Sequence, residues 1–186
     1  MPDRLHFTGT DEADELIARD PLALLIGFVL DQQVTVQKAF AGPLVLEQRA
    51  GTLDAAALAA MDLEPIFRER PAIHRFPGSM AGRVQALCEQ VAREYDGHAE
   101  RVWTEATSAE DLKARLAALP GFGDMKVRAV AAVLSKRFGV HAADALVPDM
   151  PTLGDVDSPA ALAEYQAGKR AAKARKRAER ASAAAG

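Results

Sequence analysis

A glycine turn between two helical segments is the stretch of this sequence best suited to hold a phosphate. Residues 119–126 read LPGFGDMK and separate a charged helical segment, 109–118, from an apolar and basic one, 127–138. Gly121 and Gly123 have no Cβ, so their amides approach a ligand closely, and the helix that restarts after them begins with unpaired N–H groups. Amides of that kind bind anions, so the turn predicts contact with phosphate. For a GxG pattern alone, the alternative is a structural turn.

A second candidate site follows a long apolar run. The sequence predicts a helix over 21–40 that starts with Pro21 in its first turn, and its run 22–30 is apolar on nearly all faces, which is typical of a central core helix. Asp31, Gln32 and Gln33 then turn the segment polar abruptly. Polar groups at the end of a buried segment cost free energy unless they find hydrogen bonds or reach a surface. An ordinary exit to solvent and a binding surface both remain open.

The stretch HRFPGSMAGRVQALCEQVAREYDG predicts a loop over 74–78, a helix cap at Ser79 and a long amphipathic helix. Arg75 and Arg83 lie near its start, where they either face phosphates or form a solvated first turn.

The single cysteine, Cys88, falls on the apolar stripe and is expected to be a buried thiol. One cysteine excludes an internal disulfide and any four-cysteine iron–sulfur or zinc site.

Composition predicts a mainly helical, all-α protein. Alanine, leucine and valine dominate the 186 residues, and no stretch alternates for long. The formal charge of −3 divides into +5 for residues 164–186 and −8 for residues 1–163. We therefore expect a helical domain over 1–163 and a basic, alanine-rich tail over 164–186. The acidic body counts against nucleic-acid binding, whereas the tail suits a phosphate backbone.

Several properties are expected to be absent. The four histidines are scattered without ligand spacing, so no metal and no cofactor are predicted. No apolar run approaches the ~18 residues of a membrane span, and the N-terminus lacks the basic and apolar regions of a signal peptide. A cytoplasmic, nucleoid-associated monomer is expected.

Three motifs, in order, resemble the helix-hairpin-helix (HhH-GPD) base-excision DNA glycosylase superfamily, and more closely a small actinobacterial-type subgroup. LDQQVT resembles the LSAQAT or LQQT stretch, GSMAGRVQALC the glycine, loop and basic residue, and LPGFGDMK the hairpin, here 115–138. The likeness covers about residues 20–140. It implies a two-lobed all-α fold with the active site between the lobes, acting on double-stranded DNA that contains a damaged or mismatched base.

The resemblance also implies how DNA is held. In the superfamily, the glutamine matching Gln33 enters the duplex near the extruded base and fills the gap it leaves. Basic and glycine residues hold the backbone without reading sequence. The implied DNA-binding residues are Gln32, Gln33, Arg83, Gly121, Gly123, Lys126 and Arg128.

Cleavage of the N-glycosidic bond leaves an oxocarbenium-like sugar, so the resemblance implies an ionised carboxylate beside it. The superfamily places this aspartate about twenty residues after the hairpin, where Asp144, Asp149, Asp155 and Asp157 compete. Asp155 ranks first because it precedes the cap of the next helix, and Asp157 ranks second. Plain helix capping by Asp157 or Ser158 is the alternative.

Superfamily members that also cut the DNA backbone carry a lysine two residues after the second hairpin glycine. Met125 stands there in this chain, and Lys126 follows, rotated by about 100° on a helix. The interpretation is therefore a monofunctional DNA N-glycosylase without strong lyase activity. The alternatives are a non-catalytic DNA-binding module that uses the hairpin and tail, and a helical protein-interaction domain whose hairpin is only a turn.

Overall fold

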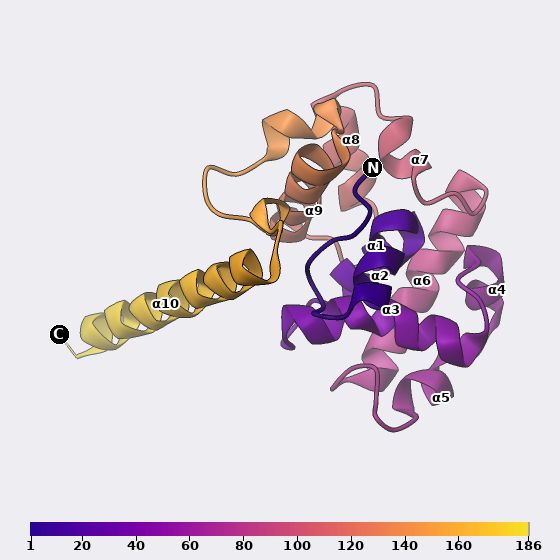
Figure 1. Ribbon diagram of the computed structural model, residues 1–186, viewed down its shortest axis with the longest axis horizontal. Helices are drawn as coiled ribbons and strands as arrows, with labels where there is room; N and C mark the ends of the chain where they lie inside the picture. The colour runs from indigo at the N-terminus through magenta and orange to yellow at the C-terminus, as the bar shows by residue number, and fades with distance from the viewer. Residues whose placement is uncertain (186) are drawn as a thin grey trace.

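The computed structural model describes residues 1–185, and within that range the regular structure is helical, with no strand, which confirms the all-α prediction (Figure 1). In chain order the elements are α1 (Asp11–Arg19), α2 (Pro21–Leu30), α3 (Val36–Ala50), α4 (Ala55–Ala60), α5 (Leu63–Arg68), α6 (Pro77–Tyr95), α7 (Arg101–Thr104), α8 (Ala109–Ala117), α9 (Asp124–Phe138), the 3₁₀ turns η1 (His141–Leu146) and η2 (Leu153–Asp155), and α10 (Pro159–Ala184).

Helix α2 is the centre of the N-terminal group of helices, as its apolar run predicts. Every residue from Leu22 to Leu30 is buried, and the helix packs against α1, α3 and α6. Its start is well defined because the Asp20 carboxylate accepts a hydrogen bond from the Ala23 amide at 2.9 Å. Gly27 lets α3 come close, since a Cβ there would lie 2.4 Å from the Phe40 ring. The polar residues that follow α2 are therefore anchored to the core.

The helix predicted over 21–40 is in fact two helices. Helix α2 ends at Leu30, and α3 starts at Val36 and continues through Gly42 and Pro43, past the predicted end at residue 40. The chain leaves the helical path at Gln33, which has a positive φ of 55°. The helix then restarts where the Thr35 hydroxyl accepts a hydrogen bond from the Lys38 amide at 3.2 Å.

The predicted cap at Ser79 is also wrong. Helix α6 begins at Pro77, with Phe76 as a cap residue that makes no side-chain cap hydrogen bond. Proline suits the first turn because its missing N–H would have no helical partner there. Ser79 therefore lies within the first turn. Cys88 is fully buried in this helix, as predicted, and burial raises the pKa of its thiol to about 12.

The C-terminal group of helices is built around the predicted hairpin. Helix α8 ends at Ala117 and α9 begins at Asp124, as the glycine turn predicts, and η1 and η2 pack along α9. Gly154 in η2 permits this packing, because a Cβ there would lie 2.3 Å from the carbonyl oxygen of Ala132. Figure 1 shows this group above the start of α10 and beside the α1–α6 group.

Helix α10 begins after the Ser158 hydroxyl accepts a hydrogen bond from the Ala161 amide at 3.1 Å, which confirms the capping expectation for Ser158. The helix is continuous across residue 163, so the basic tail is its distal part, extending away from the body in Figure 1. Among residues 1–185, no helix is long and apolar enough to cross a membrane.

Candidate functional site

A buried histidine fixes the turn that follows α2. His74 is 1% exposed, and its Nε2 lies 3.1 Å from the carbonyl oxygens of both Leu30 and Gln32. The Phe76 amide donates to its Nδ1 at 3.1 Å. Carbonyl oxygens only accept, so Nε2 carries the proton and the ring is neutral. Burial lowers the pKa of His74 and favours this neutral form.

The same turn presents Gln33 to solvent in a left-handed conformation. Gln33 is exposed and has φ 55°, which is uncommon for a residue with a Cβ. The Arg75 guanidinium donates to the Gln33 carbonyl oxygen at 3.4 Å and lies 4.9 Å from the centre of the Phe76 ring. Backbone conformations of this kind persist where the surroundings impose them, and they cluster at functional sites. The protein therefore holds an outward-facing glutamine in place.

Side chains from three distant segments meet beside this turn. The Arg83 guanidinium of α6 donates to the Gln32 side-chain oxygen at 2.6 Å. The Lys126 ammonium, in the first turn of α9, interacts electrostatically with both Asp31 and Arg83. We call Asp31, Gln32, Arg83 and Lys126 the polar junction. It lies where the two groups of helices come together.

Lys126 is the least usual member of the polar junction. Its Nζ atom is buried and has no hydrogen-bond partner within residues 1–185, and it lies 5.7 Å from the centre of the Phe122 ring. Burial lowers the pKa of Lys126 from 10.5 to about 8; Asp31 opposes this shift and Arg83 adds to it. Met125, one residue earlier, is 87% exposed. The hairpin thus directs its lysine inward and its methionine to solvent.

Asp31 supplies the carboxylate of the polar junction. Burial raises the pKa of Asp31, and the charges of Lys169 and Lys126 partly oppose that rise. Among the described residues, no ammonium or guanidinium group lies within ion-pair distance of this carboxylate, and no group donates a hydrogen bond to it. A half-buried carboxylate without a protein partner is free to face a ligand. The sequence placed Asp31 among the polar residues that follow the apolar run but gave it no catalytic role, although an acid directly after an apolar core helix was the available signal.

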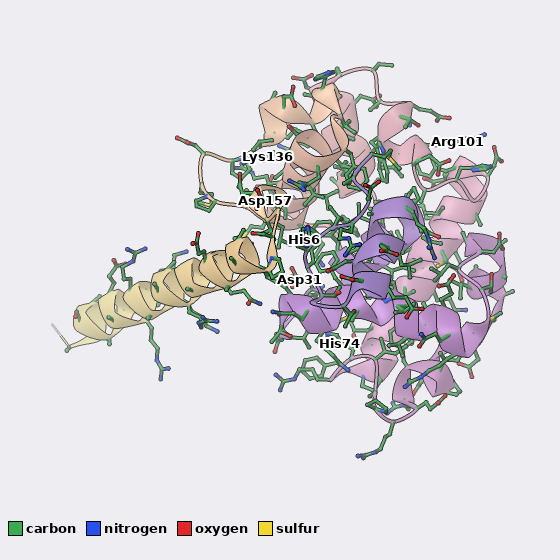
Figure 2. All side chains as sticks on the ribbon, viewed as in Figure 1. His6, Asp31, His74, Arg101, Lys136 and Asp157 are labelled. Carbon is green, nitrogen blue, oxygen red and sulfur yellow. The ribbon has the colours of Figure 1, made fainter. Side chains whose placement is uncertain are left out.

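Among residues 1–185, no hydrogen bond or ion pair links Asp155 or Asp157, the two aspartates favoured from the sequence, to the polar junction; Figure 2 labels Asp157 and Asp31. Asp155 accepts hydrogen bonds from the Thr152 amide and hydroxyl, both at 2.8 Å, and from the Lys136 ammonium at 2.6 Å. Burial alone would raise its pKa, but these hydrogen bonds outweigh burial and lower it. Lys136 follows Lys126 by ten residues, about 15 Å along α9. Asp157 is exposed.

The other two competing aspartates are also outside the polar junction. Asp144 is exposed and accepts a hydrogen bond from the Ser135 hydroxyl at 2.6 Å, which lowers its pKa. Asp149 is exposed in the loop before η2. Among residues 1–185, neither aspartate forms a hydrogen bond or an ion pair with a residue of the polar junction.

The hairpin itself has the expected geometry. Gly121 has φ 81°, a left-handed conformation that favours glycine, and Gly123 precedes the first turn of α9. Both glycines are exposed. Arg128 is exposed and pairs with Asp124 at 3.1 Å on the same helix. The turn is accessible to a large ligand.

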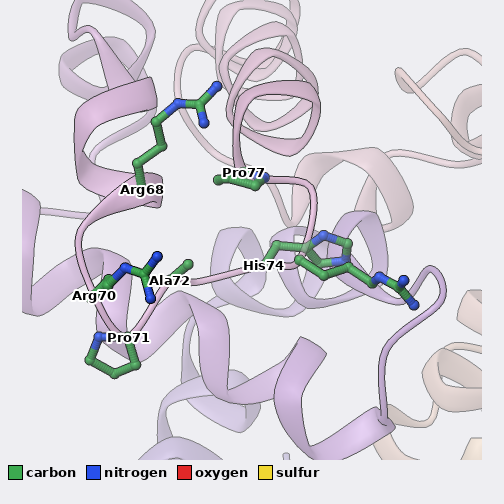
Figure 3. A pocket seen from close by; sticks show the side chains of 7 residues that line it. Arg68, Arg70, Pro71, Ala72, His74 and Pro77 are labelled. Atoms are coloured by element: carbon green, nitrogen blue, oxygen red, sulfur yellow. The ribbon is translucent and has the colours of Figure 1, made fainter.

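A basic pocket adjoins the turn after α2 (Figure 3). Its lining consists of three arginines with one histidine, two prolines and one alanine, namely Arg68, Arg70, Pro71, Ala72, His74, Arg75 and Pro77. Its His74 and Arg75 are the residues that hold the turn. Arg68 is paired with Glu64 at 2.6 Å, so the positive charge of the pocket comes mainly from Arg70 and Arg75. In residues 1–185, no group of three or more His, Cys, Asp or Glu side chains is arranged to hold a metal ion.

Comparisons of the chain with protein-family models, with curated proteins and with solved structures gave no match.

Proposed function

We propose that this protein is a monofunctional base-excision DNA N-glycosylase with a two-lobed helix-hairpin-helix fold. It would bind double-stranded DNA, extrude a damaged or mismatched base and hydrolyse its N-glycosidic bond. The polar junction would form the active site between the α1–α6 and α7–α9 groups of helices.

The convergence of three sequence motifs carries this proposal. Gln32 belongs to the LDQQVT motif, Arg83 to the GSMAGRVQALC motif and Lys126 to the hairpin, and they are about 40 to 95 residues apart in the chain. Arg83 donates a 2.6 Å hydrogen bond to Gln32, and Lys126 lies near enough to Asp31 and Arg83 for both charges to act on its pKa. A set of unrelated turns and solvated helix faces has no reason to converge in this way.

Asp31 is the carboxylate best placed for the chemistry. As the base departs, positive charge develops on the sugar, and a carboxylate beside it stabilises that charge and orients the attacking water. The Asp31 carboxylate has no protein partner to release first, whereas the Asp155 carboxylate accepts three hydrogen bonds. Burial raises the pKa of Asp31, and the neighbouring Lys169 and Lys126 ammonium groups oppose this rise and so favour the ionised form.

Gln33 suits the role of filling the space of the extruded nucleotide. Its backbone is held by the contacts of the turn, while its side chain is exposed. A wedge whose backbone is already fixed lowers the free energy of the flipped state, because less backbone conformational entropy is lost on binding. The exposed hairpin glycines and the arginines of the basic pocket would contact the flanking phosphates.

The monofunctional class rests on Met125. The solvent-exposed Met125 occupies the position at which the lyases of the superfamily carry their lysine. Lys126 instead interacts electrostatically with Asp31 and Arg83 in the polar junction. Borohydride trapping on abasic-site DNA tests this part alone. A covalent complex that forms with the parent and is lost in Lys126→Met would overturn it.

The function is tested with a panel of duplex oligonucleotides, each with one uracil, alkylated purine or mismatch at a defined position. The full chain is incubated with each duplex, abasic sites are converted to breaks with alkali, and products are separated by size. We expect cleavage at the modified position of at least one duplex. Asp31→Asn should lose at least ~100-fold of the rate, while Asp155→Asn and Asp157→Asn should stay within a few-fold of the parent.

The remaining outcomes discriminate between the alternatives. Duplex binding without base release from any substrate would overturn the enzyme and support the non-catalytic DNA-binding module. Release that survives Asp31→Asn but is lost in Asp155→Asn or Asp157→Asn would return the catalytic role to the residue ranked from the sequence. A chain that binds no duplex at low salt would exclude both DNA functions.

A further inference from the structure

Only the start of helix α10 is packed against the body. Leu162 is buried, and the side chains of Gln166 and Gln37 of α3 exchange hydrogen bonds at 2.7 and 3.2 Å. From residue 167 to residue 185 every residue is exposed, and Figure 1 shows this part of the helix running free of the body. The distal helix is thus an arm held at one end.

The cations of this arm are arranged along one side. At about 100° per residue, Lys169, Lys173, Lys176 and Arg180 fall within an arc of about 60°. Leu162 projects from the middle of the same arc, and Gln166 lies at its edge. Because Leu162 and Gln166 mark the side of α10 that packs on the body, the four cations continue that side outward. We call these four residues the basic stripe.

The first residue of the basic stripe connects it to the proposed active site. Lys169 lies 5.3 Å from the centre of the Tyr165 ring, and its charge acts on Asp31 of the polar junction. A ligand seated over the polar junction and extending past α3 would therefore meet the basic stripe next. The rest of the arm is directed toward the same ligand, because the stripe does not change side along the helix.

The chemistry of the arm selects its partner. Past Tyr165 no side chain to residue 185 is apolar and larger than alanine, so the arm has no apolar face for a hydrophobic groove or a membrane surface. The basic stripe runs over twelve residues, from Lys169 to Arg180, about 17 Å along the helix, which matches a few successive phosphates of a nucleic-acid backbone. Cations without base-reading side chains between them hold a backbone in a sequence-independent way.

We propose that the basic stripe of α10 is a backbone clamp that lies along the duplex beside the polar junction. This inference rests on the proposed function, because it takes duplex DNA as the ligand. The clamp adds affinity and salt sensitivity but does not take part in breaking the N-glycosidic bond. It also supplies the positive charge that the acidic body lacks.

The test compares two charge-matched double variants of the full chain. Lys173→Gln with Lys176→Gln removes two charges of the basic stripe, and Arg170→Gln with Arg175→Gln removes two charges from other sides of the same exposed helix. Glutamine has similar helix propensity, and far-UV circular dichroism checks that helix content is unchanged. Affinity for an undamaged duplex is measured over a salt series.

The expected result is a change in the salt slope for one variant only. Each lost backbone contact lowers the slope of log affinity against log salt by ~0.9, so the stripe variant should lose ~1.8 and the control variant less than ~0.5. Equal changes in the two variants would overturn the clamp and leave only a general effect of net charge. An unchanged slope in both would exclude the arm from the interface.

Base release separates this inference from the proposed function. At low salt and saturating protein, the stripe variant should release base at the parent rate. If the parent releases base and the salt slope changes equally in the stripe and control variants, the clamp is refuted and the proposed function is not. If the two variants show the expected difference in salt slope but the parent releases no base, the proposed enzymatic function is refuted and the clamp is not.

Discussion

Replacing Lys126 with methionine should stabilise the fold at neutral pH, although it removes a residue of the proposed active site. Methionine has nearly the length of lysine and no charge, so it fills the same space without burying an unpaired ammonium. The buried Nζ has no hydrogen-bond partner in residues 1–185, and burial lowers its pKa to about 8. The charged lysine therefore costs free energy in the folded state.

The magnitude follows from the pKa of Lys126. A shift from 10.5 to about 8, at about 1.4 kcal/mol per unit, corresponds to about 3.4 kcal/mol at full burial. Because the rest of the side chain is only half-buried, solvent screening reduces this by about half, to ~1.7 kcal/mol. The folded-state pKa is lowered, so the cost is complete below pH ~8 and fades as the pH rises from ~8 to ~10.5. The advantage of Lys126→Met should fall below ~0.5 kcal/mol at pH 10.

Urea unfolding at pH 7 and pH 10, followed by the fluorescence of the single tryptophan, Trp103, measures this difference. Trp103 is 6% exposed, so unfolding changes its surroundings. Lys113→Met is the matched control, because the Lys113 side chain is 54% exposed, and its effect should stay within ~0.5 kcal/mol at both values. The reasoning would be refuted if Lys126→Met were less stable than the parent at pH 7. It would also be refuted if the stability advantage of the variant at pH 10 equalled its advantage at pH 7.

Three further outcomes follow from contacts outside the polar junction. Asp155→Asn should destabilise the fold by ~1 kcal/mol at pH 7 in urea unfolding, and no loss at pH 7 would contradict its capping role. Because the pKa of Asp155 is lowered in the folded state, the difference should be complete above pH ~4 and be lost as the pH falls through that lowered pKa. Cys88, buried with a thiol pKa of about 12, should not react with Ellman's reagent at pH 8 until denaturant is added, and rapid labelling of the native protein would contradict its burial. Gly154→Ala should cost ~2–3 kcal/mol, because its Cβ would overlap a backbone carbonyl of α9, and an unchanged urea midpoint would show that η2 moves away easily.

Local patterns were sufficient to predict the elements whose cause is local. The apolar run 22–30 predicted a central helix, the two glycines of the hairpin predicted the turn before α9, and Ser158 before a proline predicted the start of α10. In each case the deciding residues are within one turn of the feature they specify. The burial of Cys88 follows from helical periodicity in the same way.

Features decided by distant residues could not be predicted in this way. The break after Leu30 depends on His74, which hydrogen-bonds to the turn from more than forty residues away. The ranking of Asp155 used its position before the cap of the next helix, but its Lys136 contact lies about 15 Å along α9 from the polar junction. The inward direction of Lys126 and the proximity of Asp31 likewise arise only when the two groups of helices pack together.

The acidic body is a weaker objection to DNA binding than its net charge suggests, because the charges are not evenly distributed. Many of its carboxylates pair with cations away from the polar junction, among them Glu64 with Arg68 and Asp111 with Arg115. Arg83 has no ion pair within residues 1–185 and donates only to a neutral amide, while Lys126 has no hydrogen-bond partner there. An unpaired buried ammonium is costly in the free protein, and a phosphate or a developing negative charge would relieve that cost. The buried Lys126 ammonium, which destabilises the free protein, would thus be stabilised by an anionic ligand at the polar junction.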